Sequence, residues 1–532
     1  MAFLAGLTGI AAGQETNRPA FPLFRFSSKT RGEEAIQSLG TRLPDVAAFY
    51  NKTPENLRAL LRGDNSLWAD RNGRLFYVCN WTLSANATVP ETNAAAAAEQ
   101  VAPLDQTFLL HSRPNATKKI YLDFDGYTIS GTAWNAQNNN GATIVAPPWD
   151  TDGNPSSFSA SERTAIQQIW LRVSEDYSPY DVDVTTEYPG EAALTRSNGG
   201  DQAYGVRALV SPIGDYFGNP GGIAYVGVFN ETGDYYKPAL IFPENLANNE
   251  KYIAEAISHE VGHTLGLNHD GTSTSDYYQG QGNWAPIMGV GYYEPITQWS
   301  KGEYANANNQ QDDLTVISQH GISFLPDDFG NSIATAFALS KTNISVDGLI
   351  GRTADVDFFS FQTSAGAAQI NVTPWQRGAD LHFTVSIYDG SGVLLTNREG
   401  SDSSSGVQPV SIRQNLNSGT YYVSIQGKGS GNPLTTGYSD YASLGHYTLA
   451  ITPPTTPQIS PQLASSLISG SRLLMQFSTE TGVNYVLQST TNLVPPVVWT
   501  TEQTTQGDGS VMSFQAPVGT DEPQKFFRVM VQ

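Results

Sequence analysis

The sequence predicts an α+β domain followed by all-β sandwich modules. Apolar residues recur at helical spacing in two stretches, 161–176 and 250–265, and both stretches start beside a residue that can cap a helix. Short alternating segments before and between them, such as Lys119–Asp125, are typical of strands. From about residue 325 the chain is rich in Ser, Thr and Gly and alternates as strands do, with almost no helical period.

Size and charge exclude several classes of protein. A chain of 532 residues is too long for one compact core, and about three or four domains are expected. The net charge of -21 reflects 29 Lys and Arg residues against 50 Asp and Glu residues, without a cationic cluster for phosphate, so nucleic acid is not an expected partner. No apolar run approaches the roughly eighteen residues of a membrane-spanning helix, so no transmembrane anchor is expected.

One short stretch carries the pattern of a catalytic zinc site. His259 and His263 stand four residues apart, so on a helix they share one face and can hold one ion. His269 is the third expected ligand, and Gly266 supplies the left-handed backbone that ends the helix and returns the chain to the ion. Three neutral imidazoles with an open fourth position suit catalytic Zn²⁺, and Glu260 is the expected catalytic base.

The complete string resembles the signature of the metzincin clan of zinc endopeptidases, which is followed downstream by a methionine turn. Here Met288 stands nineteen residues after His269. The resemblance implies that Met288 forms the hydrophobic floor under the zinc, and that Asp270 is structural, as in the reprolysin branch. Val290 stands where some metzincins place a metal-binding tyrosine, so no tyrosine is expected as a ligand.

The same resemblance implies a fold and a place for the substrate. Residues 106–323 are expected to form a metzincin-like catalytic domain with a mixed twisted sheet and a zinc-binding active-site helix. In such domains the edge strand of the sheet lies above the cleft, and the substrate pairs with it as an extra antiparallel strand. The glycine-rich segment that contains Gly222, Ile223, Ala224 and Tyr225 is the candidate for that edge strand.

The expected function is that of a secreted zinc-dependent metalloendopeptidase that hydrolyses peptide bonds of extracellular proteins. Zinc lowers the pKa of a bound water from about 15.7 toward about 7, and Glu260 would accept the proton of that water and pass it to the departing amine. Two alternatives stay open. A catalytically inactive adhesin or binding protein could retain a metzincin-like domain, although such relics commonly lose a ligand or the glutamate. A non-proteolytic zinc hydrolase would not need Gly266, His269 and Met288 together.

The N-terminal part is predicted to be a signal followed by a propeptide. Residues 1–13 resemble the end of a secretory signal without its basic leader, which favours a truncated signal peptide over a disordered apolar N-terminus. Residues 14–105 form a propeptide-like segment that holds the single cysteine, Cys79, so no intrachain disulfide is possible. In some metzincins a propeptide thiolate fills the fourth zinc position. However, Leu75–Cys79 reads as a buried strand without the flanking residues of that motif, so a plain buried cysteine is favoured.

The C-terminal part is predicted to be all β. Residues 324–453 resemble the pre-peptidase C-terminal domain, a β-sandwich appended to secreted bacterial proteases. Asp355 and Asp357 there could hold Ca²⁺, but aspartates of surface turns are the favoured account. Asp123 and Asp125 in the preceding domain are likewise favoured as turn-formers over calcium ligands.

A proline-rich linker and a small β-module, residues 454–532, are expected to end the chain. The two C-terminal modules could bind protein or glycan. We expect a secreted monomer that acts on protein or peptide substrates.

Overall fold

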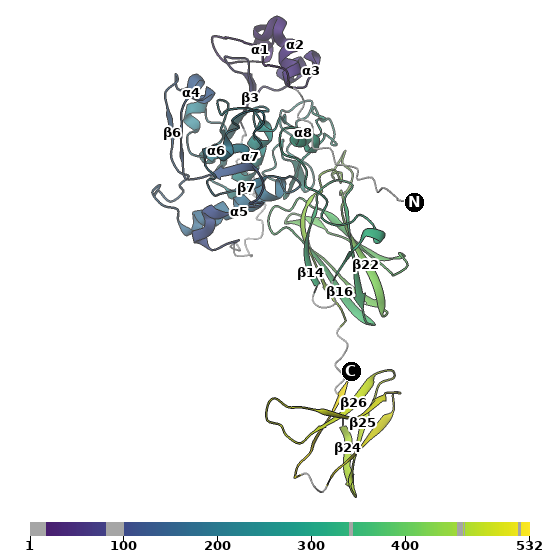
Figure 1. Ribbon diagram of the computed structural model, residues 1–532. Coiled ribbons are helices and arrows are strands. Elements are labelled where there is room, and N and C mark those ends of the chain that lie inside the picture. Colours follow the sequence, from purple (N-terminus) through teal and green to yellow (C-terminus); the bar gives the residue numbers. More distant parts are fainter. Residues whose placement is uncertain are drawn as a thin grey trace, which may run out of the picture. The chain divides into compact units, whose positions relative to one another are not determined.

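In the computed structural model, eight strands of the described residues form one sheet (Figure 1). Their order across the sheet is β1 (Thr30–Arg31), β2 (Leu67–Ala69), β3 (Leu75–Cys79), β9 (Gly222–Tyr225), β10 (Ala239–Ile241), β8 (Tyr204–Val210), β4 (Lys118–Asp123) and β7 (Asp183–Thr185). Strands β10, β8, β4 and β7 run parallel, whereas β9 is antiparallel to β10 and β3 is antiparallel to β9. The sheet is therefore mixed, and its strands come from both the propeptide-like segment and the following domain.

The structure describes residues 18–80, 101–339, 344–454, 461, 463–519 and 523–531. The predicted signal at 1–13 lies outside them. The chain divides into two units, the first of which comprises residues 1–362, 369–413 and 420–452. The second comprises residues 363–368, 414–419 and 453–532.

Two long helices pack against each other beside the sheet, α5 (Ala160–Asp176) and α7 (Glu250–Thr264). The cap of α5 is Ser159, two residues before Ser161, which is where the predicted helix begins. The side chain of Ser159 accepts a hydrogen bond from the backbone N–H of Glu162 at 3.3 Å, and the Glu162 carboxylate accepts one from the Ser159 N–H at 2.8 Å. This reciprocal pair is a capping box, and it explains why the helix begins there.

Three short helices of the N-terminal segment cover one face of β2 and β3: α1 (Gly32–Leu39), α2 (Leu43–Phe49) and α3 (Pro54–Gly63). Their apolar residues share a core with Leu75, Tyr77 and Cys79. On the other side of the sheet, a hairpin of β5 (Tyr127–Ile129) and β6 (Ile144–Ala146) frames α4 (Ala133–Asn138). These elements build a second core with Phe76 and Val78, so β3 is packed on both faces.

The rest of this domain consists of short elements. They are α6 (Glu191–Leu194), the parallel pair β11 (Trp284–Pro286) and β12 (Ile296–Gln298), α8 (Asp313–Gln319) and the 3₁₀ turns at Leu104–Leu109, Gly214–Phe217 and Pro243–Leu246. None of the described helices is both long enough and apolar enough to cross a lipid bilayer.

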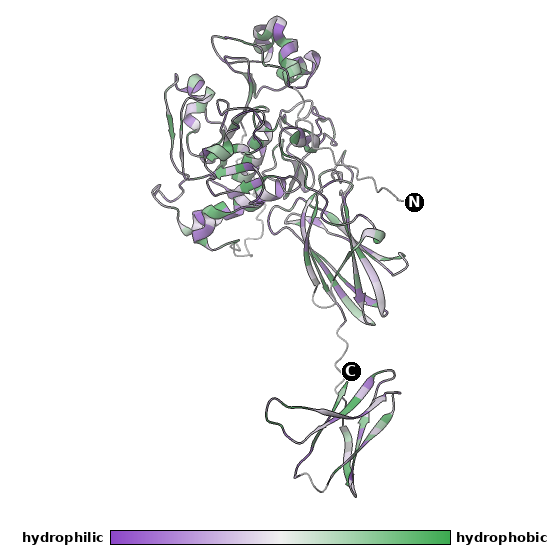
Figure 2. Ribbon diagram, viewed as in Figure 1, coloured by the Kyte–Doolittle hydropathy of each residue, from purple (hydrophilic) through white to green (hydrophobic). Residues whose placement is uncertain are grey.

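Beyond residue 324 the described residues are almost entirely β. One sheet contains β13 (Phe337–Ala338), β15 (Val356–Thr363), β22 (Gly419–Gly427), β17 (Phe383–Tyr388) and β18 (Leu394–Glu399). The second contains β14 (Ile344–Ile350), β23 (Gly445–Thr452), β16 (Gly366–Pro374) and β21 (Val410–Leu416), and β19 (Asp402–Ser403) pairs with β20 (Gly406–Val407). Buried and more exposed residues alternate along β15 and β23. Figure 2 shows hydrophobic and hydrophilic residues interspersed along the strands of this region. This alternation is that of a β-sandwich with one face of each sheet inside.

The last module is also built from two sheets. One contains β24 (Leu463–Ser469), β25 (Arg472–Ser478) and β28 (Val511–Pro517), and the other contains β27 (Thr500–Gln506), β26 (Asn484–Thr490) and β29 (Phe526–Val531). Phe477, Tyr485 and Phe514 form the centre of its small core. The rings of Phe477 and Phe514 stack at 4.8 Å.

Candidate metal centre

Helix α7 presents the first two predicted ligands. The side chain of Asn249 caps its start and accepts hydrogen bonds from the N–H groups of Lys251 and Tyr252 at 3.0 and 3.2 Å. The helix ends at Thr264, and Gly266 follows with φ of +94°. A side chain there would be strained by that φ and would also collide with the ring of His320, because an added Cβ would lie 2.7 Å from it. The chain turns at this glycine and brings His269 back toward the helix.

The three histidines converge on one point with the same ring nitrogen. Nε2 of His263 lies 3.1 Å from Nε2 of His269, and the ring of His259 is 4.7 Å from the ring of His263. All three side chains are buried. Burial, followed by the neighbouring histidines, lowers the pKa of His259 and of His263 well below the usual range. Both imidazoles are therefore neutral near pH 7, which is the form that binds a metal ion.

The second nitrogen of each ring is fixed by a hydrogen bond. Nδ1–H of His259 donates to the carbonyl of Ile287 at 2.9 Å, and Nδ1–H of His263 donates to the carbonyl of Leu267 at 2.8 Å. Nδ1–H of His269 donates to the carboxylate of Asp64 at 2.9 Å. With Nδ1 protonated, each Nε2 carries a lone pair that points into the cluster.

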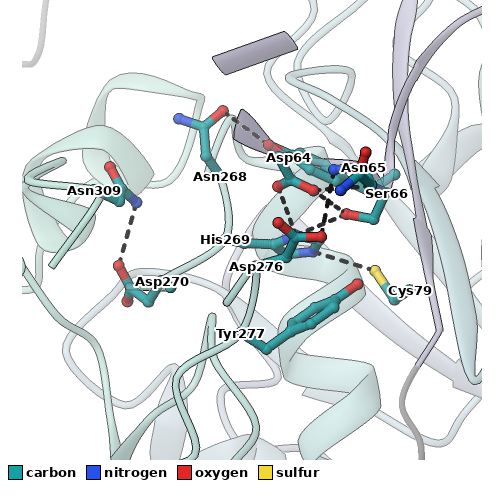
Figure 3. Close-up of polar contacts among 12 residues, drawn as sticks. Asp64, Asn65, Ser66, Cys79, Asn268, His269, Asp270, Asp276, Tyr277 and Asn309 are labelled. Carbon is teal, nitrogen blue, oxygen red and sulfur yellow. Dashed lines mark hydrogen bonds and ion pairs between the residues drawn. The ribbon is translucent and has the colours of Figure 1, made fainter. Parts of the chain in front are cut away.

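The fourth member of the cluster is the sulfur of Cys79, from strand β3 (Figure 3). Its Sγ lies 3.6 Å from Nε2 of His259, 3.5 Å from that of His263 and 3.4 Å from that of His269. The prediction of a plain buried cysteine was correct about burial and wrong about its surroundings. The sequence places this strand about 180 residues before the helix, and no local pattern shows that the two meet.

These four atoms fit zinc. A tetrahedral ion with bonds of about 2.0–2.1 Å to nitrogen and 2.3 Å to sulfur separates its ligand atoms by about 3.3 Å for two nitrogens and 3.6 Å for nitrogen and sulfur. The observed separations of 3.1 Å and 3.4–3.6 Å lie close to these values. Without a cation, burial and then Glu260 raise the pKa of the Cys79 thiol well above its usual range. A zinc ion would supply the charge that favours the thiolate.

Glu260 lies beside this cluster with its carboxylate buried. Within the described part of the chain neither carboxylate oxygen has a nitrogen or oxygen hydrogen-bond partner, and the thiol of Cys79 is its polar neighbour. Burial raises the pKa of Glu260 well above its usual range. An added Cβ on Gly222 would lie 2.3 Å from the Glu260 carboxylate, so only glycine lets strand β9 approach so closely. The carboxylate is thus held between the metal cluster and the strand.

Met288 and Asp270 pack beside the segment that carries the three histidines. An added Cβ on Gly262 would lie 2.7 Å from the sulfur of Met288, so the buried methionine packs directly against the helix that carries the ligands. The N–H of Asp270 donates to the carbonyl of Met288 at 2.8 Å. Its carboxylate accepts a hydrogen bond from Asn309 at 3.2 Å, and burial raises its pKa to about 7. Asp270 therefore links the segment after His269 to Met288 and to the loop at Asn309.

Strand β9 is not the edge of the sheet, contrary to the sequence-based expectation, because β3 pairs with it on the outer side. Its four residues, Gly222, Ile223, Ala224 and Tyr225, pair antiparallel with Cys79, Val78, Tyr77 and Phe76. The N–H of Gly221 donates to the carbonyl of Cys79 at 2.9 Å, and that of Val226 to the carbonyl of Leu75 at 3.0 Å. The propeptide-like segment thus occupies the place expected for a substrate strand.

Three residues of the site were not predicted. Asp64, from the N-terminal segment, orients His269, and the hydroxyl of Ser66 lies 3.0 Å from the same ring nitrogen (Figure 3). Tyr277 lies over His269 with its ring 4.3 Å away. None of the three belongs to the zinc motif. Asp64 and Ser66 reach His269 from a distant segment, 205 and 203 residues away, whereas Tyr277 follows His269 closely in the sequence. A cavity of about 860 Å³ is lined by His269, Asp64 and the loop at 307–311, among other residues.

A separate acidic cluster lies at the start of the first sandwich. Carboxylate oxygens of Asp327, Asp328 and Asp357 lie within 4.8 Å of one another. Asp357 is 0% exposed and Asp355 is 7% exposed, so the interpretation of these two as surface residues is wrong. Asp355 does belong to a turn, since its carboxylate accepts a hydrogen bond from the N–H of Gly351 at 2.7 Å. One carboxylate oxygen of Asp355 and one of Asp357 lack a hydrogen-bond partner among the described residues. Burial, together with neighbouring Asp328 and Asp355, raises the pKa of Asp357 to about 8, which indicates uncompensated negative charge.

Asp123 and Asp125 have a different role. Asp123 is 0% exposed and forms an ion pair with Arg207. The N–H of Asp125 donates to the Asp123 carboxylate at 3.2 Å, as in a turn. This arrangement is consistent with turn formation.

No protein-family model matches the sequence. Over 141 residues the chain is 26% identical to serralysin C of Dickeya chrysanthemi, an aligned region that covers 26% of this chain and 28% of that protein. The chain thus spans less than a third of the length of this curated relative.

Two solved structures are similar to part of the chain. The pre-peptidase C-terminal domain of a collagenase from Bacillus anthracis is 16% identical, with 24% of this chain and 98% of that chain covered and a TM-score of 0.17. The surface-associated copper-binding protein CorA of Methylomicrobium album BG8 is 11% identical, with 22% and 98% covered and a TM-score of 0.16. TM-scores this low do not show a shared fold.

Proposed function

We propose that this protein is a secreted zinc metalloendopeptidase, present here in a latent form. The observation that carries the proposal is the convergence of three buried imidazoles beside a buried glutamate. The partial similarity to serralysin C agrees with it. The proposed ligands are His259, His263 and His269, with Cys79 as the fourth in the latent form.

The residues of the site divide the chemistry among them. When bound, zinc would polarise the scissile carbonyl and make water a nucleophile near neutral pH. The backbone of β9 would hold the substrate as an added strand, as it now holds β3. Glu260 would take the proton of the attacking water and deliver it to the departing amine. The hydrogen bonds to Ile287 and Leu267 keep the first two imidazoles in the required tautomer.

Latency follows from where β3 lies. The strand fills the cleft along β9, and the sulfur of Cys79 takes the position that water must occupy for hydrolysis. Removal of the segment would free both the cleft along β9 and the position that the Cys79 sulfur now fills. The segment would also take away Asp64, so His269 must find another hydrogen-bond partner in the processed enzyme.

The proposal is tested with the full chain carrying a specific protease site inserted between Pro90 and Glu91, cut only after folding. We expect the cut protein to cleave a mixture of quenched fluorogenic peptides and the uncut protein to show almost no cleavage. Dialysis against a chelator should abolish cleavage until zinc is restored. Bound zinc without cleavage of any peptide or protein would favour the alternative, a non-catalytic binding protein.

We also propose that the acidic cluster of the first sandwich holds Ca²⁺. Carboxylates are the ligands that calcium prefers, and Asp357 is a buried carboxylate of the cluster with one unpartnered oxygen. Calcium titrated into the zinc-loaded full chain should raise the unfolding temperature of this sandwich by several degrees. At a calcium concentration one hundred times the Kd, binding adds about 2.7 kcal/mol to the free energy of unfolding. Calorimetry of the parent and of Asp357→Asn measures this, with the exposed Asp440→Asn as the matched control.

The calcium effect should depend on pH in a defined direction. The folded-state pKa of Asp357 is raised to about 8, so without a cation its contribution to stability is present below about pH 4 and is lost as the pH rises through about 8. Calcium should therefore stabilise most at pH 8 or above and least near pH 4. An equal shift of the unfolding temperature in the parent and in Asp357→Asn would contradict the site.

A further inference from the structure

Strand β3 shows how an extended chain fits the cleft. The strand runs toward the metal cluster, so Phe76 and Val78 lie along β9 ahead of Cys79, which reaches the cluster. Side chains alternate along a strand, and here the two sets face different surroundings. Tyr77 and Cys79 face the cluster, and the Tyr77 ring stacks on that of His263 at 4.1 Å. Phe76 and Val78 face away from the metal into a second apolar core.

The core around Phe76 is an aromatic pocket of the catalytic domain. The Phe76 ring lies 5.9 Å from the ring of Trp134, edge to face, and 5.4 Å from that of Tyr225. Aliphatic residues of β5 and β6 complete the wall, among them Ile129 and Ile144. Most of the described residues of this core belong to the catalytic domain, and the N-terminal segment contributes Phe76 and Val78 with Trp68 at the margin.

The wall of the pocket is fixed by contacts within the catalytic domain. The indole N–H of Trp134 donates to the carbonyl of Pro238 at 2.9 Å, and its ring contacts Tyr225 at 4.5 Å and Phe217 at 5.9 Å. None of these contacts of Trp134 involves the N-terminal segment, although the hydroxyl of Tyr225 also donates to Asp70 of that segment at 3.1 Å. The pocket is therefore expected to persist when β3 leaves, and leaving it empty would expose apolar surface to water.

We propose that this pocket is a subsite for a large aromatic side chain of the protein substrate, and that β3 occupies it as a substitute for the substrate. The inference rests on the proposed peptidase function and names its substrate class. That class is extended protein segments with Phe or Tyr on the unprimed side, three residues before the residue that lies at the metal. The register of β3 sets this distance, since Phe76 precedes Cys79 by three residues. An aliphatic residue two positions after the aromatic one corresponds to Val78.

The test uses the full chain cut at the inserted site between Pro90 and Glu91, and quenched peptides with one Phe moved through each position before the scissile bond. We expect kcat/KM to be about 10- to 100-fold higher with Phe than with Ala at one position, because a buried aromatic side chain contributes that much binding. The Trp134→Leu variant should bring the ratio of the two kcat/KM values close to one. Trp149→Leu, which removes a buried tryptophan elsewhere in the domain, should keep the ratio.

A binding measurement tests the pocket independently, without the Trp134→Leu variant and without peptide cleavage. A synthetic peptide of residues 71–80 with Cys79→Ser is titrated against the cut protein by fluorescence anisotropy. Adding Phe76→Ala should weaken its binding about 10-fold or more, whereas Leu75→Ala, on the face that contacts the N-terminal helices, should have little effect.

The outcomes separate the two proposals. Cleavage that is indifferent to Phe at every position would overturn the subsite and leave the peptidase in place. Binding that depends on Phe76 without cleavage would keep the pocket and contradict the peptidase. Equal weakening by Phe76→Ala and Leu75→Ala would also count against the subsite.

Discussion

The Glu260→Gln variant, after removal of the N-terminal segment, should lose peptide cleavage by about 10²–10⁴-fold in kcat, because general acid–base catalysis contributes about that factor. The amide has almost the same shape as the carboxylate and can still pack against Gly222. It cannot accept a proton from water at neutral pH. Zinc content should stay at the parental value, since the ligands are imidazoles. Steady-state kinetics with quenched peptides, at matched zinc occupancy, measures the effect.

The matched control for this variant lies on the same helix. Glu250 stands in the first turn of α7, far along the helix from the histidines, and its carboxylate lies 3.5 Å from Arg172. Glu250→Gln should therefore keep kcat close to that of the parent. If Glu260→Gln and Glu250→Gln cleaved equally well, Glu260 could not be the base.

The second large effect is expected from Cys79. In the uncut full chain, Cys79→Ala removes the sulfur that faces all three imidazoles and leaves the pairing of β3 with β9 in place. The basal rate of peptide cleavage should rise at least about tenfold, since a loss of about 1.4 kcal/mol in the affinity of the segment for the closed state already gives that factor. The same fluorogenic assay, run without any processing step, measures it.

A change in the same strand that keeps the thiol serves as the control. Tyr77→Phe removes only a hydroxyl, which donates to Asn268 at 3.4 Å, and should leave the uncut chain nearly silent. A silent Cys79→Ala chain that becomes active when cut would show that strand pairing alone enforces latency. That result would show that the Cys79 sulfur has no part in latency.

The sequence was sufficient to predict those features that depend on residues close together in the chain. Spacing on one helix predicted that His259 and His263 share a face, and Gly266 predicted the turn that returns His269, because both follow from backbone geometry within a few residues. The change to β structure after residue 324 was also predicted, from the alternation of that region. Each of these statements needs only the order of neighbouring residues.

Contacts between distant segments could not be predicted in this way. The alternation of Leu75–Cys79 indicated a buried strand, but nothing in it named β9 as the partner. As a result Cys79 was interpreted as a core residue and β9 as an exposed edge. Asp64 was missed for the same reason, since its role depends on a hydrogen bond to His269 across 205 residues. Asp357 was misjudged because its burial arises from the packing of two sheets.

The most direct test of the central claim is X-ray absorption spectroscopy at the zinc edge of the full chain before and after cutting between residues 90 and 91. The account predicts one sulfur at about 2.3 Å and three nitrogens at about 2.0–2.1 Å in the uncut protein. After the N-terminal segment is released, the sulfur should be replaced by an oxygen. A metal without sulfur in the uncut protein, or no bound zinc at all, would contradict a zinc site closed by Cys79.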